Sequence, residues 1–478
     1  MFKNNLTELL KTFSAKELKE FRGFLNSSYF NKRQAVTNLF EIIVKFHPEF
    51  DSRFFEKEYI YERLFPGKKY NDSSLRVLTH YLTELTEKFI VIQKLESNET
   101  EYSLQLGNAL FERNQIKLLE KSITSAFKSL DKSVFDSEDY FYYKFRIQNQ
   151  MTYFRYASNY AYLDKIILQS DWENVFEDFT NYYLLKSMIM YLNSINLQKL
   201  VNKKFRTASF GELINKIKPE DYADIPVIRM YYYLIKMKLD KGHETYYFQL
   251  KDLLSSTKKD LNIYDLIGAY VHMEAYCTER ITEGIKEFEM ERFELYKNEL
   301  NDKTYLMNDN TMSPLFYRNV VLAGLTLKEF EWTRNFINKY RSGLNKKFRN
   351  NYYFYGMAKY EFSVKNFESS LDLISKIKFD EVYMKINTKI LYLQLLYELG
   401  YEDTLISSLE NFRHFLNNNK LIPDERKILY SKFYKFLNKI VAIRDKNKKA
   451  ESGILKKNIS KENFLPNKDW LLEKVKSL

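Results

Sequence analysis

Residues that break or redirect the backbone are scarce in this sequence, which has 12 glycines and 7 prolines among 478 residues. Both counts fall below the usual frequencies of roughly 7% for glycine and 5% for proline. A β-sandwich or barrel needs a turn signal about every 8–12 residues. The shortage therefore argues against an all-β fold and favours long helices joined by few turns.

Cysteine is limited to Cys277, which excludes an internal disulfide and a cysteine-based zinc site and is expected to be a small core residue. Residues 1–10 lack the apolar stretch of a secretion signal. The longest run without charged residues or histidine, residues 187–198, is shorter than the roughly 20 apolar residues of a membrane-spanning helix. We expect a soluble, cytoplasmic protein with no membrane partner.

Clustered glycines, which let backbone amides approach a phosphate group, are also missing. The two closest glycines, Gly343 and Gly356, lie 13 residues apart, so nucleotide-binding loops and the glycine-flanked nucleophile of hydrolases are not expected. The five histidines are scattered, and no two stand four residues apart to bind a metal from one helical turn. We therefore expect no cofactor, no metal and no small-molecule substrate, and we do not expect an enzyme.

A helical pattern fills the chain instead. Hydrophobic residues make up 45% and charged residues 29% of the sequence, which is typical of a globular protein with a large core. All seven prolines can be placed at the edges of segments, and between them apolar residues recur with the helical period. The predicted fold class is all-α.

Residues 1–100 predict a separate N-terminal helical unit. Ser14 and Glu17 have the spacing of a helix-capping box, and a long helix with an apolar stripe is expected over residues 73–92. The polar run Glu96–Glu101 is taken as the boundary of this unit. Its turn, Leu64–Lys68, resembles that of uncharacterised bacterial helical proteins, a resemblance that implies no function.

A short motif recurs in the last third of the chain. It consists of an aromatic residue, a glutamate, and a small hydroxyl residue three positions after the aromatic, and it occurs at Phe330–Thr333, Phe367–Ser370 and Tyr401–Thr404. The spacings are 37 and 34 residues. Each motif opens a predicted helix and follows another one, so residues 101–443 predict an array of antiparallel helix pairs.

The segment Tyr353–Ile377 resembles a tetratricopeptide repeat. Phe354 stands in the large-aromatic position of the first helix, Met357 and Ala358 follow as the leucine-and-small pair, and Ser370 takes the small position of the second helix. The resemblance covers about residues 315–416 and is fainter upstream. It implies an α-solenoid in which each helix pair buries its apolar face against the next pair.

The C-terminal end departs from this pattern. Residues 444–461 hold seven basic residues against two acidic ones, which predicts an exposed basic linker. Residues 462–478 predict a short amphipathic helix that caps the last repeat.

The resemblance implies a protein-binding scaffold or adaptor, because the first helices of such an array form a concave wall that binds peptides or helices of other proteins. If the family pattern carries over, five residues face a partner on that wall: Tyr355, Lys359, Ser363, Gln394 and Glu398.

Nucleic acid is the alternative partner, by one of two routes. Lys346, Lys347 and Arg349 lie next to tyrosines, and a single strand is bound by such positive charge and aromatic rings. The competing interpretation is an ordinary solvated turn beside core aromatics.

The second route is a helix-turn-helix in the N-terminal unit. Its second helix would contact a DNA groove through Arg76, Thr79 and His80. The turn of residues 66–71 is longer than the usual three or four residues, so a helical hairpin packed in a bundle is the preferred interpretation.

Overall fold

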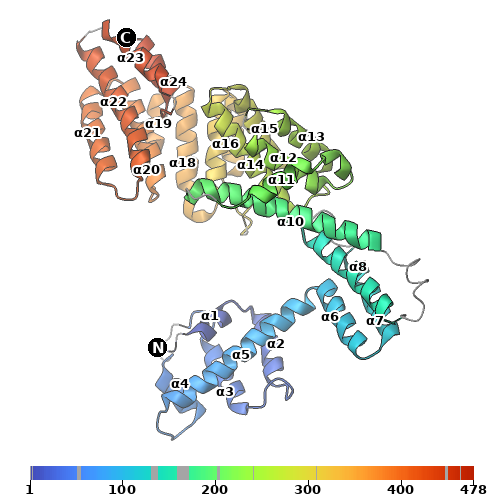
Figure 1. Cartoon of the computed structure of the whole chain (residues 1–478). Helices are drawn as coiled ribbons and strands as arrows, with labels where there is room; N and C mark the ends of the chain where they lie inside the picture. Colours follow the sequence, from blue (N-terminus) through green and yellow to red (C-terminus); the bar gives the residue numbers. More distant parts are fainter. Residues whose placement is uncertain are drawn as a thin grey trace. The chain divides into compact units, whose positions relative to one another are not determined.

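The computed structural model describes residues 2, 4–50, 55–130, 138–158, 172–201, 205–240, 242–307, 309–446, 450–462 and 464–478. Over these residues the chain is all-α, with isolated β-bridges in place of strands, which confirms the predicted fold class. The helices form two compact units, residues 1–183 (unit 1) and residues 184–478 (unit 2). Each unit is described by itself (Figure 1).

Unit 1 is built from short helices at its beginning and longer ones at its end. They are α1 (Asn5–Lys11), α2 (Ala15–Leu25), α3 (Gln34–Ile43), the 3-10 helix η1 (Val44–Phe46), α4 (Lys57–Leu64), α5 (Asp72–Glu96), α6 (Glu99–Glu112), α7 (Ile116–Leu130), α8 (Glu138–Ser158) and the start of α10 (Trp172–Val201).

The first five helices share a core centred on α5. Phe21 of α2 lies 5.1 Å, between ring centroids, from both Phe40 of α3 and Phe89 of α5. The predicted capping box is present, because Ser14 Oγ accepts from the Glu17 amide and the Glu17 carboxylate accepts from the Ser14 amide. The apolar stripe of α5 lies in this core, as its helical spacing predicts.

The predicted boundary at residue 100 is not the edge of a compact unit. The polar run Glu96–Glu101 is a helix end followed at once by a helix start, and Asn98 caps α6 by accepting from the Glu101 amide at 2.9 Å. Helices α6, α7 and α8 then share their own apolar core, and Arg146 pairs with Glu101. The run is polar because it caps a helix, and unit 1 continues to residue 183.

Unit 2 begins within α10 and consists of helices joined by short turns. They are α11 (Ala208–Lys216), the 3-10 helix η3 (Pro219–Tyr222), α12 (Pro226–Leu239), α13 (Thr245–Thr257), α14 (Ile263–Thr282), α15 (Glu287–Asp302), α16 (Pro314–Thr326), α17 (Phe330–Tyr340), α18 (Lys346–Ser363), α19 (Phe367–Ser375), α20 (Val382–Glu398), α21 (Glu402–Asn418), α22 (Asp424–Lys446), α23 (Ala450–Lys461) and α24 (Lys468–Lys476).

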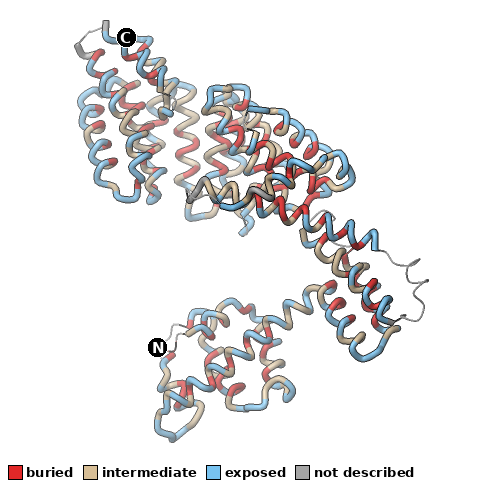
Figure 2. The backbone as a smooth tube through the Cα atoms, in the orientation of Figure 1, coloured by how far each residue is buried: buried red, intermediate tan, exposed pale blue. Residues whose placement is uncertain are grey.

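Helices of unit 2 pack against their neighbours in the chain. From α14 onward each helix contacts the next one, and α12 contacts both α13 and α14. The first helices of successive pairs also touch, as α16 does α18 and α18 does α20. Figure 2 shows buried residues along the sides of these helices that face other helices. Such contacts between neighbours in sequence are what stacked helix pairs require.

Small residues allow the close approach within two of these pairs. Thr333 of α17 and Ser370 of α19, both in the recurring motif, are fully buried. Ser370 Oγ donates to the Ala358 carbonyl oxygen at 2.7 Å, and Thr333 lies against Gly324 of α16. The third motif is displaced by one residue, because Thr404 is exposed and Leu405 is buried in its place.

The predicted basic linker of residues 444–461 is wrong for most of its length. Helix α22 extends to Lys446, and Ala450–Lys461 form α23. Leu455 and Ile459, four residues apart on one face of α23, are buried in a core that includes Leu471 of α24. The many lysines occupy the other faces of an amphipathic helix, which the charge count alone does not reveal. The predicted C-terminal helix is present as α24.

In the ranges that the structure describes, no helix combines the length and the apolarity that crossing a bilayer demands.

Gly324 provides a test of the packing in unit 2. A Cβ added at this glycine would collide with Thr333 Oγ1 and approach Phe293 Cε2 to 3.4 Å. We expect Gly324→Ala to destabilise the protein by about 1–3 kcal/mol, because the two helices must move apart. The measurement is the midpoint of urea unfolding followed by circular dichroism.

Gly268 of α14 is the matched control, since a Cβ there meets nothing within 4 Å. Gly268→Ala should instead stabilise the protein by roughly 0.5–1 kcal/mol through helix propensity. Equal effects of the two substitutions would show that α16 and α17 are not in close contact.

Candidate functional site

Two of the five residues predicted to face a partner lie in the core. Tyr355 is 3% exposed and Gln394 is 1% exposed. Helix α18 packs against both α16 and α20. A side chain on α18 or α20 that points toward the first helix of the neighbouring pair is therefore covered by that helix. The prediction that these two residues face a partner was wrong.

Glu398 also has a different role, because it holds the C-terminal helix. Its Oε1 accepts from Trp470 Nε1 at 2.7 Å and pairs with Lys474 Nζ at 2.7 Å. The Trp470 ring packs edge-on against Tyr397. The predicted partner position is therefore occupied by α24 of the same chain.

Lys359, another of the five residues predicted to face a partner, lies in an unusual environment. It is half-buried, and its ammonium group pairs with no carboxylate in the described part of the chain. Burial lowers the pKa of Lys359 to about 8. The neighbouring Ser363, one turn later, uses its Oγ to donate to the Lys359 carbonyl oxygen at 2.9 Å.

Arg318 is a second half-buried cation, on the neighbouring helix α16. Its Nη2 donates to Asn319 Oδ1 at 2.9 Å, and its Nε is buried without a hydrogen-bond partner. Burial raises the pKa of Tyr355 on α18, and the charge of Arg318 lowers it in part. Helix α16, which carries Arg318, packs against α18. We call Arg318 and Lys359 the helix-A cations, because α16 and α18 are each the first helix, or helix A, of a helix pair.

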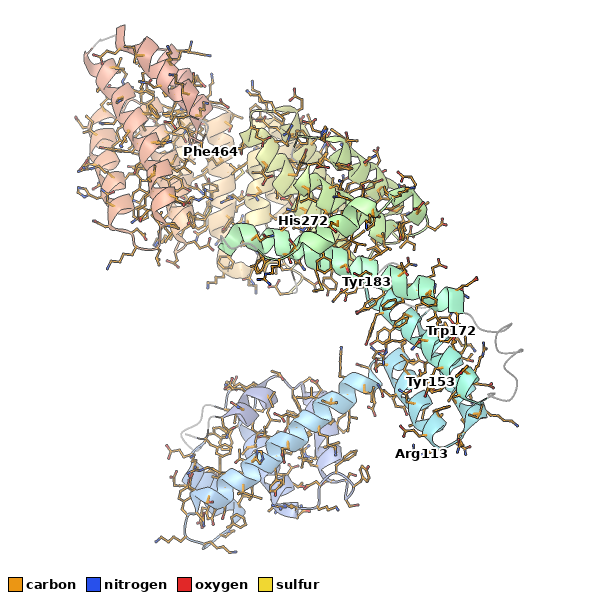
Figure 3. The ribbon with its side chains drawn as sticks, in the orientation of Figure 1. Arg113, Tyr153, Trp172, Tyr183, His272 and Phe464 are labelled. Carbon is orange, nitrogen blue, oxygen red and sulfur yellow. The ribbon has the colours of Figure 1, made fainter. Side chains whose placement is uncertain are left out.

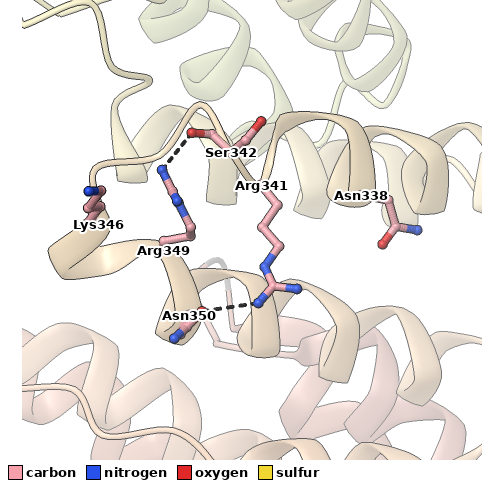
Figure 4. A pocket seen from close by; sticks show the side chains of 6 residues that line it. All are labelled: Asn338, Arg341, Ser342, Lys346, Arg349 and Asn350. Carbon is pink, nitrogen blue, oxygen red and sulfur yellow. Dashed lines mark hydrogen bonds between the residues drawn. The ribbon is translucent and has the colours of Figure 1, made fainter.

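A basic hollow of about 510 Å³ lies where the chain turns from α17 into α18 (Figure 4). It is lined by Asn338, Arg341, Ser342, Lys346, Arg349 and Asn350. No carboxylate is among these residues. The structure thus brings together two of the three residues predicted for nucleic acid at this turn, Lys346 and Arg349, and places the third, Lys347, outside the lining.

The two arginines of the basic hollow are held in place by the turn. Arg349 Nη2 donates to the carbonyl oxygens of Ser342 at 2.8 Å and Leu344 at 3.0 Å. Arg341 Nη2 donates to Asn350 Oδ1 at 3.2 Å, and its guanidinium carbon lies 4.2 Å from the centre of the Tyr353 ring. These contacts fix the guanidinium groups but do not neutralise their charge.

The sequence analysis did not select Asn338, Ser342 and Asn350 as lining residues. A signal for the region exists in the sequence, since residues 332–360 contain seven lysines and arginines and no aspartate or glutamate. The charge pattern of the sequence therefore indicates the region, but it does not identify the uncharged residues that line the hollow.

The candidate DNA-contacting residues of α5 interact within their own helix. Arg76 pairs with Asp72, and Thr79 Oγ1 donates to the Leu75 carbonyl oxygen at 2.7 Å. His80 Nε2 lies 3.4 Å from Glu84 Oε1.

A buried polar cluster lies between α14 and α15. Glu299 is 5% exposed, and its Oε1 has no hydrogen-bond partner. Burial raises the pKa of Glu299, and the adjacent Glu274 carboxyl raises it further. The two carboxyl groups therefore retain a proton that a free glutamate loses near pH 4.5.

Cys277, also on α14, is the core residue that the sequence analysis expected, and His272 on the same helix is half-buried. Cys277 is fully buried beside Tyr247, and burial raises the pKa of its thiol to about 12. Burial lowers the pKa of His272 to about 4, so the imidazole is neutral at pH 7. Figure 3 labels His272 on its helix.

Within the described ranges, no three or more histidine, cysteine, aspartate and glutamate side chains are grouped so that they could hold a metal ion. No protein-family model, curated protein or solved structure matches the chain. The resemblance to tetratricopeptide repeats therefore stays a prediction.

The first prediction for this region concerns Lys359. Its lowered pKa means that the charged form is less stable in the folded than in the unfolded chain, so wild-type stability should rise as the pH increases from about 8 toward 10.5. Lys359→Met should remove this dependence and raise the melting temperature at pH 7, by roughly 1–2 °C per kcal/mol gained. Calorimetry at several pH values measures both, and an unchanged profile would contradict the burial of a charged amine.

The second prediction concerns the carboxyl pair. The pKa of Glu299 is higher in the folded protein than in the unfolded chain, where it is about 4.3. The protonated carboxyl group therefore favours the folded state at a pH below about 4.3, and this contribution to stability is lost as the pH rises through the pKa of the folded state. Glu299→Gln should flatten this decline and stabilise the protein at neutral pH. Glu287→Gln, an exposed position on the same helix, is the control and should keep the wild-type slope in urea unfolding at pH 5, 7 and 9.

Proposed function

We propose that this protein is a non-catalytic scaffold that binds another protein through the first helices of unit 2. The contacts between successive helix pairs support the proposal, because stacked pairs present the same helix side repeatedly and so offer an extended surface. A partner can lie along several such helices at once.

The observation that carries the proposal is the pair of helix-A cations. A half-buried charge costs stability unless a counter-ion offsets the lost hydration. Neither Arg318 nor Lys359 has a carboxylate partner in the described part of the chain. A carboxylate supplied by a partner would offset that cost, so we propose a protein with an acidic segment as the partner.

The helix-turn-helix route receives no comparable support. Glu84 and Glu87 are exposed on α5, in the turns that follow His80. Their negative charges would repel the phosphates of a DNA backbone.

Lys359→Met tests the proposed function. We expect the variant to bind the partner at least tenfold more weakly although it is more stable than the wild type, because the substitution removes the positive charge and improves burial. The tagged full chain is used to purify partners from its native cells with nuclease present. Affinity is then measured by calorimetry with the purified partner.

Lys439→Met, at an exposed position on α22, is the control with the same change in net charge and should bind like the wild type. Equal affinity of wild type and Lys359→Met for every nuclease-resistant partner would overturn the proposal.

A further inference from the structure

Among the residues that the structure describes, no carboxylate pairs with the positively charged groups of the basic hollow. Lys346 and Lys347 are exposed and form no ion pair in the described part of the chain. At the turn that follows α19, by comparison, Lys376 pairs with Asp372 at 2.6 Å. The Asp309 carboxylate accepts hydrogen bonds from Thr311 Oγ1 and, at 3.4 Å, from Asn345 Nδ2. Asn345 precedes Lys346 in the chain, and neither Asp309 nor Asn345 lines the hollow.

The hollow is also organised in advance of any ligand. Arg349 and Arg341 are anchored by carbonyl, amide and aromatic contacts, so little side-chain entropy remains to be lost when an anion binds. Ser342, Asn338 and Asn350 add uncharged hydrogen-bonding groups to the lining. This combination of fixed guanidinium groups and neutral polar groups suits a phosphate group.

The charge continues beyond the hollow on both helices. Arg334 and Lys339 are exposed on α17, and Lys347 is exposed on α18. One phosphate of a modified peptide would engage only the hollow and leave these charges unused. A polymer with a phosphate at every unit can neutralise several of them together.

Base stacking is not prominent at this surface. The ring of Tyr353 is covered by Arg341, and Tyr352 is buried. Contacts would therefore be made to the backbone of the polymer rather than to its bases, which makes binding independent of sequence.

From the fixed arginines of the hollow and the lysines around it that form no ion pair in the described residues, we infer that the turn between α17 and α18 binds the phosphodiester backbone of nucleic acid. This activity goes beyond the proposed function and uses different residues. Loss of one need not affect the other, since Lys359 does not line the hollow.

The experiment is a salt titration with a fluorescent 20-nucleotide thymidine strand and the full chain, read by anisotropy. We expect Lys346→Glu/Lys347→Glu to weaken binding at least tenfold at low salt. It should also reduce the slope of log Kd against log salt by about two, because each removed lysine contributes about one unit. Arg341 and Arg349 are kept because they hold the turn together.

Lys420→Glu/Lys435→Glu is the matched control, with the same change in net charge at two exposed positions of unit 2. It should retain the wild-type slope, and so should Lys359→Met. Three results would overturn the inference: no binding of the strand at low salt, equal weakening by both double variants, or displacement of the strand by equimolar phosphopeptide.

Discussion

The close approach of successive helices in unit 2 is the constraint on which the rest of the structure depends. A single helix pair cannot cover its own apolar face, so each pair must lie close enough to the next to exclude water. Gly324 against Thr333, and Ala358 against Ser370, supply that closeness, since a larger side chain at either contact would separate the helices. The burial of Lys359 and Arg318 follows from the same packing, because both extend from first helices that lie side by side.

Much of the fold could be predicted from local chemistry. Pro226 and Pro314 open helices, and Ser14 and Glu17 form the capping box that their spacing predicts. These features depend on residues within one turn of each other. The extent of unit 1 could not be predicted, because the polar residues that end α5 and start α6 look the same as those of a linker. Helix α23 was missed for a related reason: its two buried residues are outnumbered by lysines.

The candidate site was less predictable, because burial depends on residues that are distant in sequence. Glu398 would be a surface residue if Trp470, 72 positions later, did not reach it. Tyr355 and Gln394 have the right spacing for a helix surface, but the adjacent first helices cover them. Lys359 is half-buried on α18, and its lack of a carboxylate partner among the described residues is visible only in three dimensions. At the basic hollow, by contrast, a run of residues close in sequence also meets in space.

Stacked helix pairs imply a gradient of stability, because a helix at the end of unit 2 has a neighbour on one side while α16 and α18 have neighbours on both. Native-state hydrogen exchange of the full chain measures this gradient helix by helix. The account predicts the slowest amide exchange in α16, α18 and α20 and faster exchange in α24. Uniform protection throughout unit 2, or faster exchange in α18 than in α24, would contradict it.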